Sequence, residues 1–182
     1  GFMLHSADAL DFDFASLTTG DTHLRVVGNL PYNISTPLIF KLLEQAQIIT
    51  DMHFMLQLEV VERLAASPGS KDWGRLGVMA QLRCEVEQLF EVPPEAFYPK
   101  PKVRSAVVRL TPHPEPPFPN VDPTSLGRVV TQAFSQRRKT LRNNFKGTLE
   151  DSDFGTLAID PSARAETLSI TDLVAITVHL QG

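Results

Sequence analysis

Apolar and polar positions along the first two thirds of the chain alternate in the manner of short strands and amphipathic helices. Residues 24–28 form an apolar run with two β-branched valines, which predicts a buried strand. Ser35 or Thr36 can cap the helix that follows, with Pro37 at its first position. The apolar residues 2–4 predict the end of another strand. Further strands are expected at 52–58, 85–92 and 105–110, and further helices at 59–66 and 76–82.

The last third of the chain has a different pattern. Residues 112–123 contain six prolines, which is typical of a linker. Beyond them the strand pattern stops, and apolar residues recur at helical spacing in 124–135 and 171–180. We therefore predict an α/β domain at 1–111, a proline-rich linker at 112–123 and a small helical domain at 124–182.

Composition narrows the class of protein. The 182 residues are 42% hydrophobic and 21% charged, with a formal net charge of −4, as in ordinary globular proteins. No apolar run reaches membrane-spanning length, and the amino terminus does not resemble a signal peptide. Cys84 is the single cysteine, and the five histidines lack metal-ligand spacing. We expect a cytoplasmic protein that binds no metal and no membrane.

The tetrapeptide Asn29-Leu30-Pro31-Tyr32 follows the strand at 24–28, where α/β sheets commonly bind ligands. The Asn29 side-chain oxygen and the Leu30 carbonyl could accept hydrogen bonds from both N6 hydrogens of an adenine. Such bonds would favour a tetrahedral N6 with an available lone pair. Pro31 limits the shapes of the loop, and Tyr32 offers a ring on which an extruded base can stack. The alternative is a plain β-turn, since Asn, Pro and Gly are common turn residues.

The tetrapeptide belongs to a longer set of motifs. They are VVGNLPYNISTPLIFKLL (26–43), HFMLQLEVVERL (53–64), GRLGVMAQ (74–81), VPPEAFYPKPKVRSAVVRL (92–110), AFSQRRKTLRN (133–143) and RAETLS (164–169). Together they resemble the ribosomal RNA adenine N6-dimethyltransferases, nearest to the small-subunit group whose loss gives kasugamycin resistance. The resemblance implies a Rossmann-like S-adenosylmethionine-dependent methyltransferase sheet followed by an all-helical domain. The family's glycine-rich cofactor loop is not found here, so we expect only the C-terminal half of that sheet.

The resemblance also implies a reaction. The family transfers methyl groups from S-adenosylmethionine to N6 of two adjacent adenosines in a 3′-terminal hairpin loop of small-subunit (16S) ribosomal RNA. The implied partner is the immature 30S particle, and we expect a monomer. Two alternatives are a large-subunit ribosomal RNA adenine methyltransferase and a non-catalytic assembly factor of the small subunit.

The resemblance assigns roles to particular residues. The catalytic set is Asn29, Leu30, Pro31, Tyr32 and Phe97, with Phe97 clamping the target adenine opposite Tyr32. The cofactor-binding set is Asp8, Ala9 and Asn29, with Asp8 accepting the adenine amino group of the donor. Without the resemblance, an aspartate after a short apolar run is usually a turn or cap residue.

Two further features concern RNA. Cations expected to contact phosphate are Lys100, Lys102, Arg104, Arg137, Arg138, Lys139 and Arg142. The run at 137–142 is expected to start a helix, and its alternative role is a solvated charged face. Trp73, the single tryptophan, is either a packing anchor or an RNA contact beside Lys71 and Arg75, and we favour packing.

Overall fold

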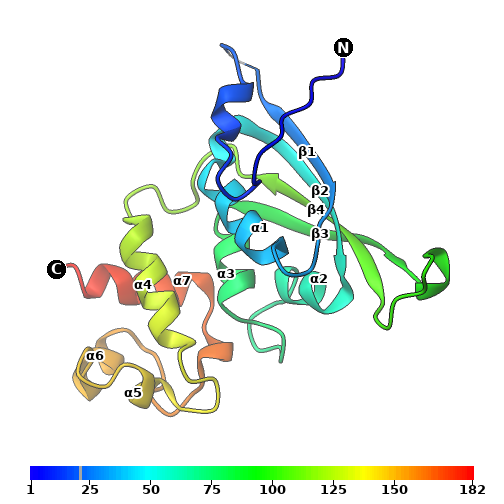
Figure 1. Cartoon of the computed structure of the whole chain (residues 1–182). Coiled ribbons are helices and arrows are strands. Elements are labelled where there is room, and N and C mark those ends of the chain that lie inside the picture. The colour runs from blue at the N-terminus through cyan, green and yellow to red at the C-terminus, as the bar shows by residue number, and fades with distance from the viewer. Residues whose placement is uncertain (21) are drawn as a thin grey trace. The chain divides into compact units, whose positions relative to one another are not determined.

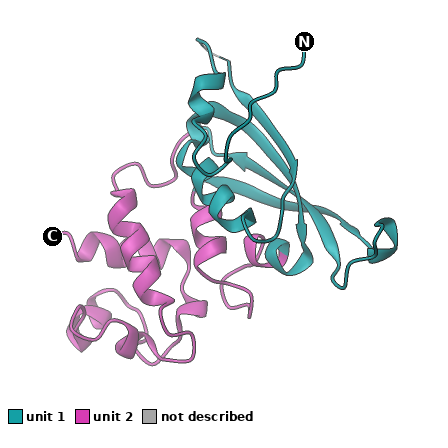
Figure 2. Cartoon of the chain, viewed as in Figure 1, with its two compact units in different colours: residues 1–61, 83–114 teal, residues 62–82, 115–182 magenta. Residues whose placement is uncertain are grey.

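The computed structural model describes residues 1–20 and 22–182. The chain forms two compact units, shown in different colours in Figure 2: residues 1–61 with 83–114, and residues 62–82 with 115–182. The chain passes between the units three times, and the third passage, after Pro114, falls within the predicted linker. The sequence did not indicate that residues 62–82 belong with the C-terminal unit. The division into domains at 1–111 and 124–182 stays a prediction.

The first unit contains a four-stranded sheet with the order β1-β2-β4-β3 (Figure 1). Its strands are β1 (Leu24–Asn29), β2 (Ile49–Gln57), β3 (Cys84–Val92) and β4 (Ser105–Pro112). β1 and β2 are parallel, whereas β4 is antiparallel to both β2 and β3. Helix α1 (Ser35–Glu44) and the 3-10 turn Ala46–Ile48 connect β1 to β2. This mixed sheet with a crossover helix is the expected α/β architecture.

One face of the sheet forms the core of the first unit. Every second residue of β2 and β4 places a fully buried side chain on this face, namely Met52, Phe54, Leu56, Ala106, Val108 and Leu110. Helix α1 covers this sheet in Figure 1 and buries Leu38, Ile39, Leu42 and Leu43. The period-two burial in β2 explains why its pattern predicted a strand.

The opposite face carries charged and exposed side chains. Arg25 of β1 pairs with Asp51 of β2, and Val27 beside them is 78% exposed. The prediction of a strand end at residues 2–4 is wrong. Phe2, Met3 and Leu4 are exposed and outside any strand, because no described strand pairs with this short apolar run.

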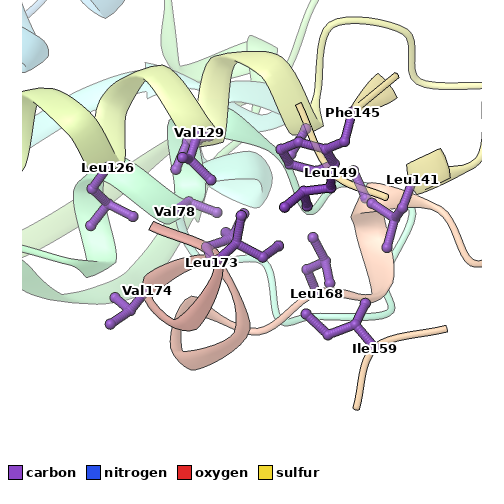
Figure 3. Close-up of a cluster of buried hydrophobic side chains, with 14 of the residues drawn as sticks. Val78, Leu126, Val129, Leu141, Phe145, Leu149, Ile159, Leu168, Leu173 and Val174 are labelled. Atoms are coloured by element: carbon purple, nitrogen blue, oxygen red, sulfur yellow. The ribbon is translucent and has the colours of Figure 1, made fainter. Parts of the chain in front are cut away.

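The second unit is helical. Helix α2 (Leu58–Leu64) follows β2 and enters this unit, which also contains α3 (Arg75–Gln81), α4 (Pro123–Ala133), α5 (Leu141–Asn144), α6 (Asp151–Thr156) and α7 (Ile170–His179). Figure 3 shows Val78, Leu126, Val129 and Leu173 among the buried side chains of one hydrophobic cluster. The Asp122 carboxylate caps α4, and Ser169 with Asp172 forms a capping box at α7. These caps explain why the two longer helices begin where they do.

Candidate functional site

The site predicted from the sequence begins at the carboxyl end of β1. Pairing with β2 continues one residue past the strand, because the Leu30 N–H donates a hydrogen bond of 3.3 Å to the Met55 carbonyl. The Leu30 side chain is buried and returns over Gly28, where an added Cβ would lie 2.9 Å from Leu30 Cδ2. Gly28 therefore leaves room for Leu30, and this packing fixes the backbone that carries Asn29.

The turn after Leu30 leads directly into α1. The N–H groups of Ile34 and Ser35 donate to the Pro31 carbonyl at 3.2 and 3.0 Å. The Ser35 hydroxyl donates to the Tyr32 carbonyl at 3.2 Å, so this side chain bonds backwards and does not cap the helix. The predicted cap was wrong: α1 begins at Ser35 after Ile34, and Pro37 is its third residue. The tight turn leaves the Tyr32 side chain 50% exposed.

Two acceptors at this turn have no partner within the part of the chain that the structure describes. No hydrogen bond engages the exposed Asn29 side chain, and none reaches the Leu30 carbonyl. Both groups belong to consecutive residues whose backbone is fixed by β1 and by the Leu30 packing. The arrangement can therefore accept two hydrogen bonds from one planar donor without first breaking an internal bond.

Phe97 belongs to the β3–β4 loop, which we define as residues 93–104. Val92 at the end of β3 pairs with Ser105 at the start of β4, and Ser105 also pairs with Gln57 at the end of β2. The loop therefore leaves the sheet at the end where β1 and β2 finish, which is also the end that carries Asn29. Phe97 is half-buried there, and no ring contact joins it to Tyr32 among the described residues.

Asp8 lies in a turn. Its carboxylate accepts a hydrogen bond of 2.8 Å from the Leu10 N–H, and its carbonyl accepts from the N–H groups of Asp11 and Phe12. Lys41 of α1 donates to the Leu10 carbonyl at 2.5 Å, which ties this turn to the later half of the helix. No described contact joins Asp8 or Ala9 to Asn29. Asp8 thus has the geometry of a turn residue, with one carboxylate oxygen left to accept a further donor.

The cations of the β3–β4 loop differ in their ionic partners. Lys100 pairs with Glu95 in the same loop, and the hydrogen bond from Lys100 holds the pKa of the Glu95 carboxyl below its ordinary value. Arg104 pairs with Glu91 of β3. Lys102 is exposed and has no ion pair with any carboxylate in residues 1–20 or 22–182. Lys102 is therefore the cation of this loop whose charge is least neutralised.

Residues 137–140 of the basic run of the second unit form a loop, so the prediction that this run starts a helix is wrong for its first four residues. Thr140 forms an isolated β-bridge with Arg164, and α5 begins only at Leu141. The Asn144 side chain is buried and donates to the Ala133 carbonyl at 2.6 Å, which holds the end of α4 close to α5. The connection between these helices must therefore turn sharply.

Pairing divides this second group of cations as well. Arg142 makes two hydrogen bonds to Asp151, at 2.9 and 3.0 Å, and Arg137 lies 4.0 Å from a carboxylate oxygen of Glu166. Arg138 and Lys139 are exposed and have no carboxylate partner within the described ranges. The loop therefore presents two unpaired positive charges to solvent.

The remaining features of the described residues concern the single thiol, metal binding, membrane-spanning helices and one exposed ring. Burial raises the pKa of the Cys84 thiol to about 12, so this group stays protonated at neutral pH. No cluster of three or more histidine, cysteine, aspartate or glutamate side chains that could hold a metal occurs in residues 1–20 and 22–182. Within the same residues, no helix is both long and apolar enough to cross a membrane. Tyr98, the residue after Phe97, is not among the site residues predicted from the sequence, and its side chain is 102% exposed.

The fold is that of the Rossmann-like methyltransferases. A dimethyladenosine transferase from Plasmodium falciparum superposes with a TM-score of 0.80 at 24% identity, covering 97% of this chain and 71% of that one. The 23S rRNA methyltransferase ErmE gives a TM-score of 0.69 at 21% identity, with 97% and 70% covered. At such identities the likeness concerns the fold alone.

The sequence identifies the family. The family model described as "Ribosomal RNA adenine dimethylase" matches residues 2–181. A protein of Pseudomonas aeruginosa named "Ribosomal RNA small subunit methyltransferase A" is 60% identical over 179 residues, which are 98% of this chain and 67% of that protein. A protein of the same name from Chromohalobacter salexigens is 59% identical, with 98% and 65% covered. The chain belongs to the ribosomal RNA adenine dimethylase family, and it spans about two thirds of the length of these relatives.

Proposed function

We propose that this protein transfers methyl groups from S-adenosylmethionine to N6 of two adjacent adenosines in a 3′-terminal hairpin loop of 16S ribosomal RNA. The product is N6,N6-dimethyladenosine, formed during ribosome maturation. Family membership and the shared name of the relatives from P. aeruginosa and C. salexigens support this substrate over large-subunit RNA. The proposal implies the immature 30S particle as partner and a cytoplasmic monomer as the working form.

The single observation that carries the proposal is the pair of unpartnered acceptors at Asn29 and Leu30. The Asn29 side-chain oxygen and the Leu30 carbonyl accept one N6 hydrogen each, which draws the N6 lone pair out of conjugation with the ring. The backbone that carries both acceptors is fixed before the substrate arrives, so little backbone reorganisation is needed in the transition state. Tyr32 stacks on the adenine from the turn, and Phe97 supplies the opposite wall. Pro31 keeps the turn stiff.

The methyl donor, when bound, supplies an electrophilic carbon on a positively charged sulfur. Asp8, Ala9 and Asn29 are the residues of this chain that would hold it. The donor set fits in one respect, because the exposed Asp8 carboxylate keeps one oxygen for an amino group after bonding the Leu10 N–H. With the donor held there, N6 would form its new bond to the methyl carbon as the carbon–sulfur bond breaks, the thioether would leave, and the proton lost from N6 would pass to solvent.

The test compares Asn29 at the end of β1 with Asn33 in the turn that follows. Asn29→Ala removes an acceptor that engages N6 as its charge develops, so methyl transfer to undermethylated 30S particles should fall about 100-fold or more. Binding to the particle should stay near the unmodified value. Asn33→Ala is the matched control, since Asn33 is exposed four residues later and lies outside the proposed acceptor pair. Equal turnover of the two variants would refute the role of Asn29.

The same assay separates the alternatives. Transfer to isolated 50S subunits in place of 30S particles would indicate the large-subunit class. Tight binding of 30S particles by the unmodified protein, without transfer, would indicate an assembly factor.

A further inference from the structure

Tyr98 is the most exposed of the large apolar side chains in the described part of the chain. Its relative exposure of 102% means that the ring makes almost no contact with the rest of the protein. Among the other exposed aromatic side chains of the first unit, Phe2 near the start of the chain is 92% exposed, whereas Tyr32 and Phe90 are 50% and 58% exposed. A ring held fully in water has no stabilising role in the fold, so its place in the loop calls for another explanation.

The loop around Tyr98 is ordered by its own contacts. A 3-10 turn at Pro94–Ala96 precedes Phe97, and the Ala96 and Phe97 N–H groups donate to the carbonyls of Pro93 and Pro94. The Lys100–Glu95 ion pair then closes the loop across Tyr98. Prolines at 99 and 101 restrict the chain beyond it. The tyrosine is therefore presented by a backbone that is already restricted, which lowers the entropy lost when a ligand binds.

The backbone also separates Tyr98 from its neighbour. Phe97 has an extended conformation, with φ −119° and ψ 149°, and successive side chains on extended backbone point to opposite sides. Phe97 is half-buried, whereas Tyr98 is fully exposed. The two rings therefore point to different sides of the loop backbone. If Phe97 faces the target adenine, Tyr98 faces something else.

The cations of the same loop indicate which kind of group Tyr98 contacts. Lys102 is exposed and has no ion pair among residues 1–20 and 22–182, whereas Lys100 and Arg104 are each paired with a glutamate. An exposed ring and an unneutralised cation four residues apart in one loop suit an unpaired nucleotide, whose base stacks and whose phosphate attracts the cation.

We propose that Tyr98 stacks on an unpaired nucleotide next to the target adenosine, with Lys102 at its phosphate. This inference rests on the proposed function for the identity of the RNA. The proposed contact of Tyr98 is separate from the contacts to the target adenine. It favours single-stranded RNA, because only an unpaired base can stack on the ring.

The experiment measures the affinity of the protein for a synthetic RNA hairpin whose loop holds two adjacent adenosines. The donor is left out, so the result does not depend on methyl transfer. Tyr98→Ala should weaken binding about tenfold, because one base–aromatic stack is lost. Tyr98→Phe keeps the ring and should bind within about twofold of the unmodified protein. Phe90→Ala is the control for loss of an exposed aromatic of the same unit and should have no effect.

Ultraviolet crosslinking of the same hairpin gives an independent readout. The crosslinked peptide should contain Tyr98, and Tyr98→Ala should lose that crosslink while the fold is retained. Hairpin affinity unchanged by Tyr98→Ala would overturn the proposal. Unchanged hairpin affinity with weakened binding to 30S particles would also overturn it, because Tyr98 would then contact a ribosomal protein. Loss of methyl transfer in Asn29→Ala tests the proposed function separately.

Discussion

The indole N–H of Trp73 donates a hydrogen bond of 2.8 Å to the carbonyl of Leu168, which lies 95 residues further along the chain. The indole is only 2% exposed and belongs to the hydrophobic cluster of the second unit. The prediction that Trp73 is a packing anchor and not an RNA contact is therefore confirmed. The bond gives the polar end of a buried indole its partner.

Trp73→Phe should destabilise the protein by about 2 kcal/mol, because the Leu168 carbonyl loses its partner and the smaller ring leaves a gap. The measurement is urea denaturation followed by far-ultraviolet circular dichroism, since this variant lacks the single tryptophan. Unmodified protein should show strongly blue-shifted tryptophan emission that exposed quenchers barely reach. Emission typical of a solvated indole would contradict the burial.

Two helical glycines should respond in opposite ways to alanine. A Cβ at Gly77 in α3 would lie 2.6 Å from the Arg63 carbonyl oxygen and 3.4 Å from the Trp73 ring, so Gly77→Ala should cost about 1–3 kcal/mol. Gly155 in α6 has no atom within 4 Å of the same position, so Gly155→Ala should be neutral or stabilise by up to about 1 kcal/mol. Thermal unfolding of both variants checks the pair. A stabilising Gly77→Ala would mean that α3 and the Arg63 backbone are further apart than described.

Asp51 should make the first unit sensitive to acid. Its carboxylate accepts hydrogen bonds from Arg25, including one of 2.5 Å, and also lies 3.4 Å from His53 Nδ1. The Arg25 hydrogen bonds hold the pKa of Asp51 below its ordinary value. A lowered folded-state pKa means that this stabilisation is complete above the unfolded pKa of about 4 and is lost as the pH falls through the folded value.

The matching variant is Asp51→Asn, which should cost about 1–2 kcal/mol at pH 7 and flatten the loss of stability below pH ~4. Urea denaturation at several pH values from neutral to acid measures both effects. Glu85→Gln, at an exposed carboxylate without an ion pair among the described residues, is the control. Parallel profiles of stability against pH for Asp51→Asn and the unmodified protein would show that the Arg25–Asp51 pair does not cause the loss of stability in acid.

The cations of the second unit should contribute unequally to RNA binding. Replacing Arg138 and Lys139 by glutamine should lower the slope of log affinity against log salt by about 1.4, or roughly 0.7 for each single-strand phosphate contact. Replacing Arg137 and Arg142 should change the slope less, because Glu166 and Asp151 already neutralise them. Affinity for the hairpin between low and moderate salt is the measurement. Equal salt slopes for the two double variants would show that pairing with a carboxylate does not reduce the contribution of Arg137 and Arg142 to RNA binding.

Elements set by local pattern could be predicted from the sequence. The apolar run at 24–28 became β1, the pattern at 52–58 became β2, and the face of Leu126, Val129 and Val130 became α4. Features that depend on contacts with residues far along the chain could not be predicted from the sequence. The basic run was expected to start a helix, but Thr140 bridges to Arg164, and no periodicity within 137–142 reports that contact.

In the candidate site, too, the sequence predicted local position but not contacts between distant residues. Position in the chain predicted that Asn29 would follow a strand at 24–28. In the structure Asn29 is the last residue of β1, and its side chain has no internal partner in the described residues. The pairing of Lys100, Arg104, Arg137 and Arg142 with carboxylates depends on the β3–β4 loop geometry and on the packing of the second unit. The sequence therefore indicated which residues are cationic but not which of them keep their charge for a ligand.

The second unit is assembled from two separated stretches of chain, and this has a consequence for folding during synthesis. Residues 62–82 leave the ribosome long before residues 115–182, yet the Trp73 indole donates its hydrogen bond to Leu168 and shares a cluster made mostly of side chains from that later stretch. At about 5–20 residues per second, the 95 residues between them take roughly 5–20 s to appear. During that interval Trp73 and Val78 lack most of the side chains of their cluster, so we expect this unit to fold only after the later stretch has been synthesised.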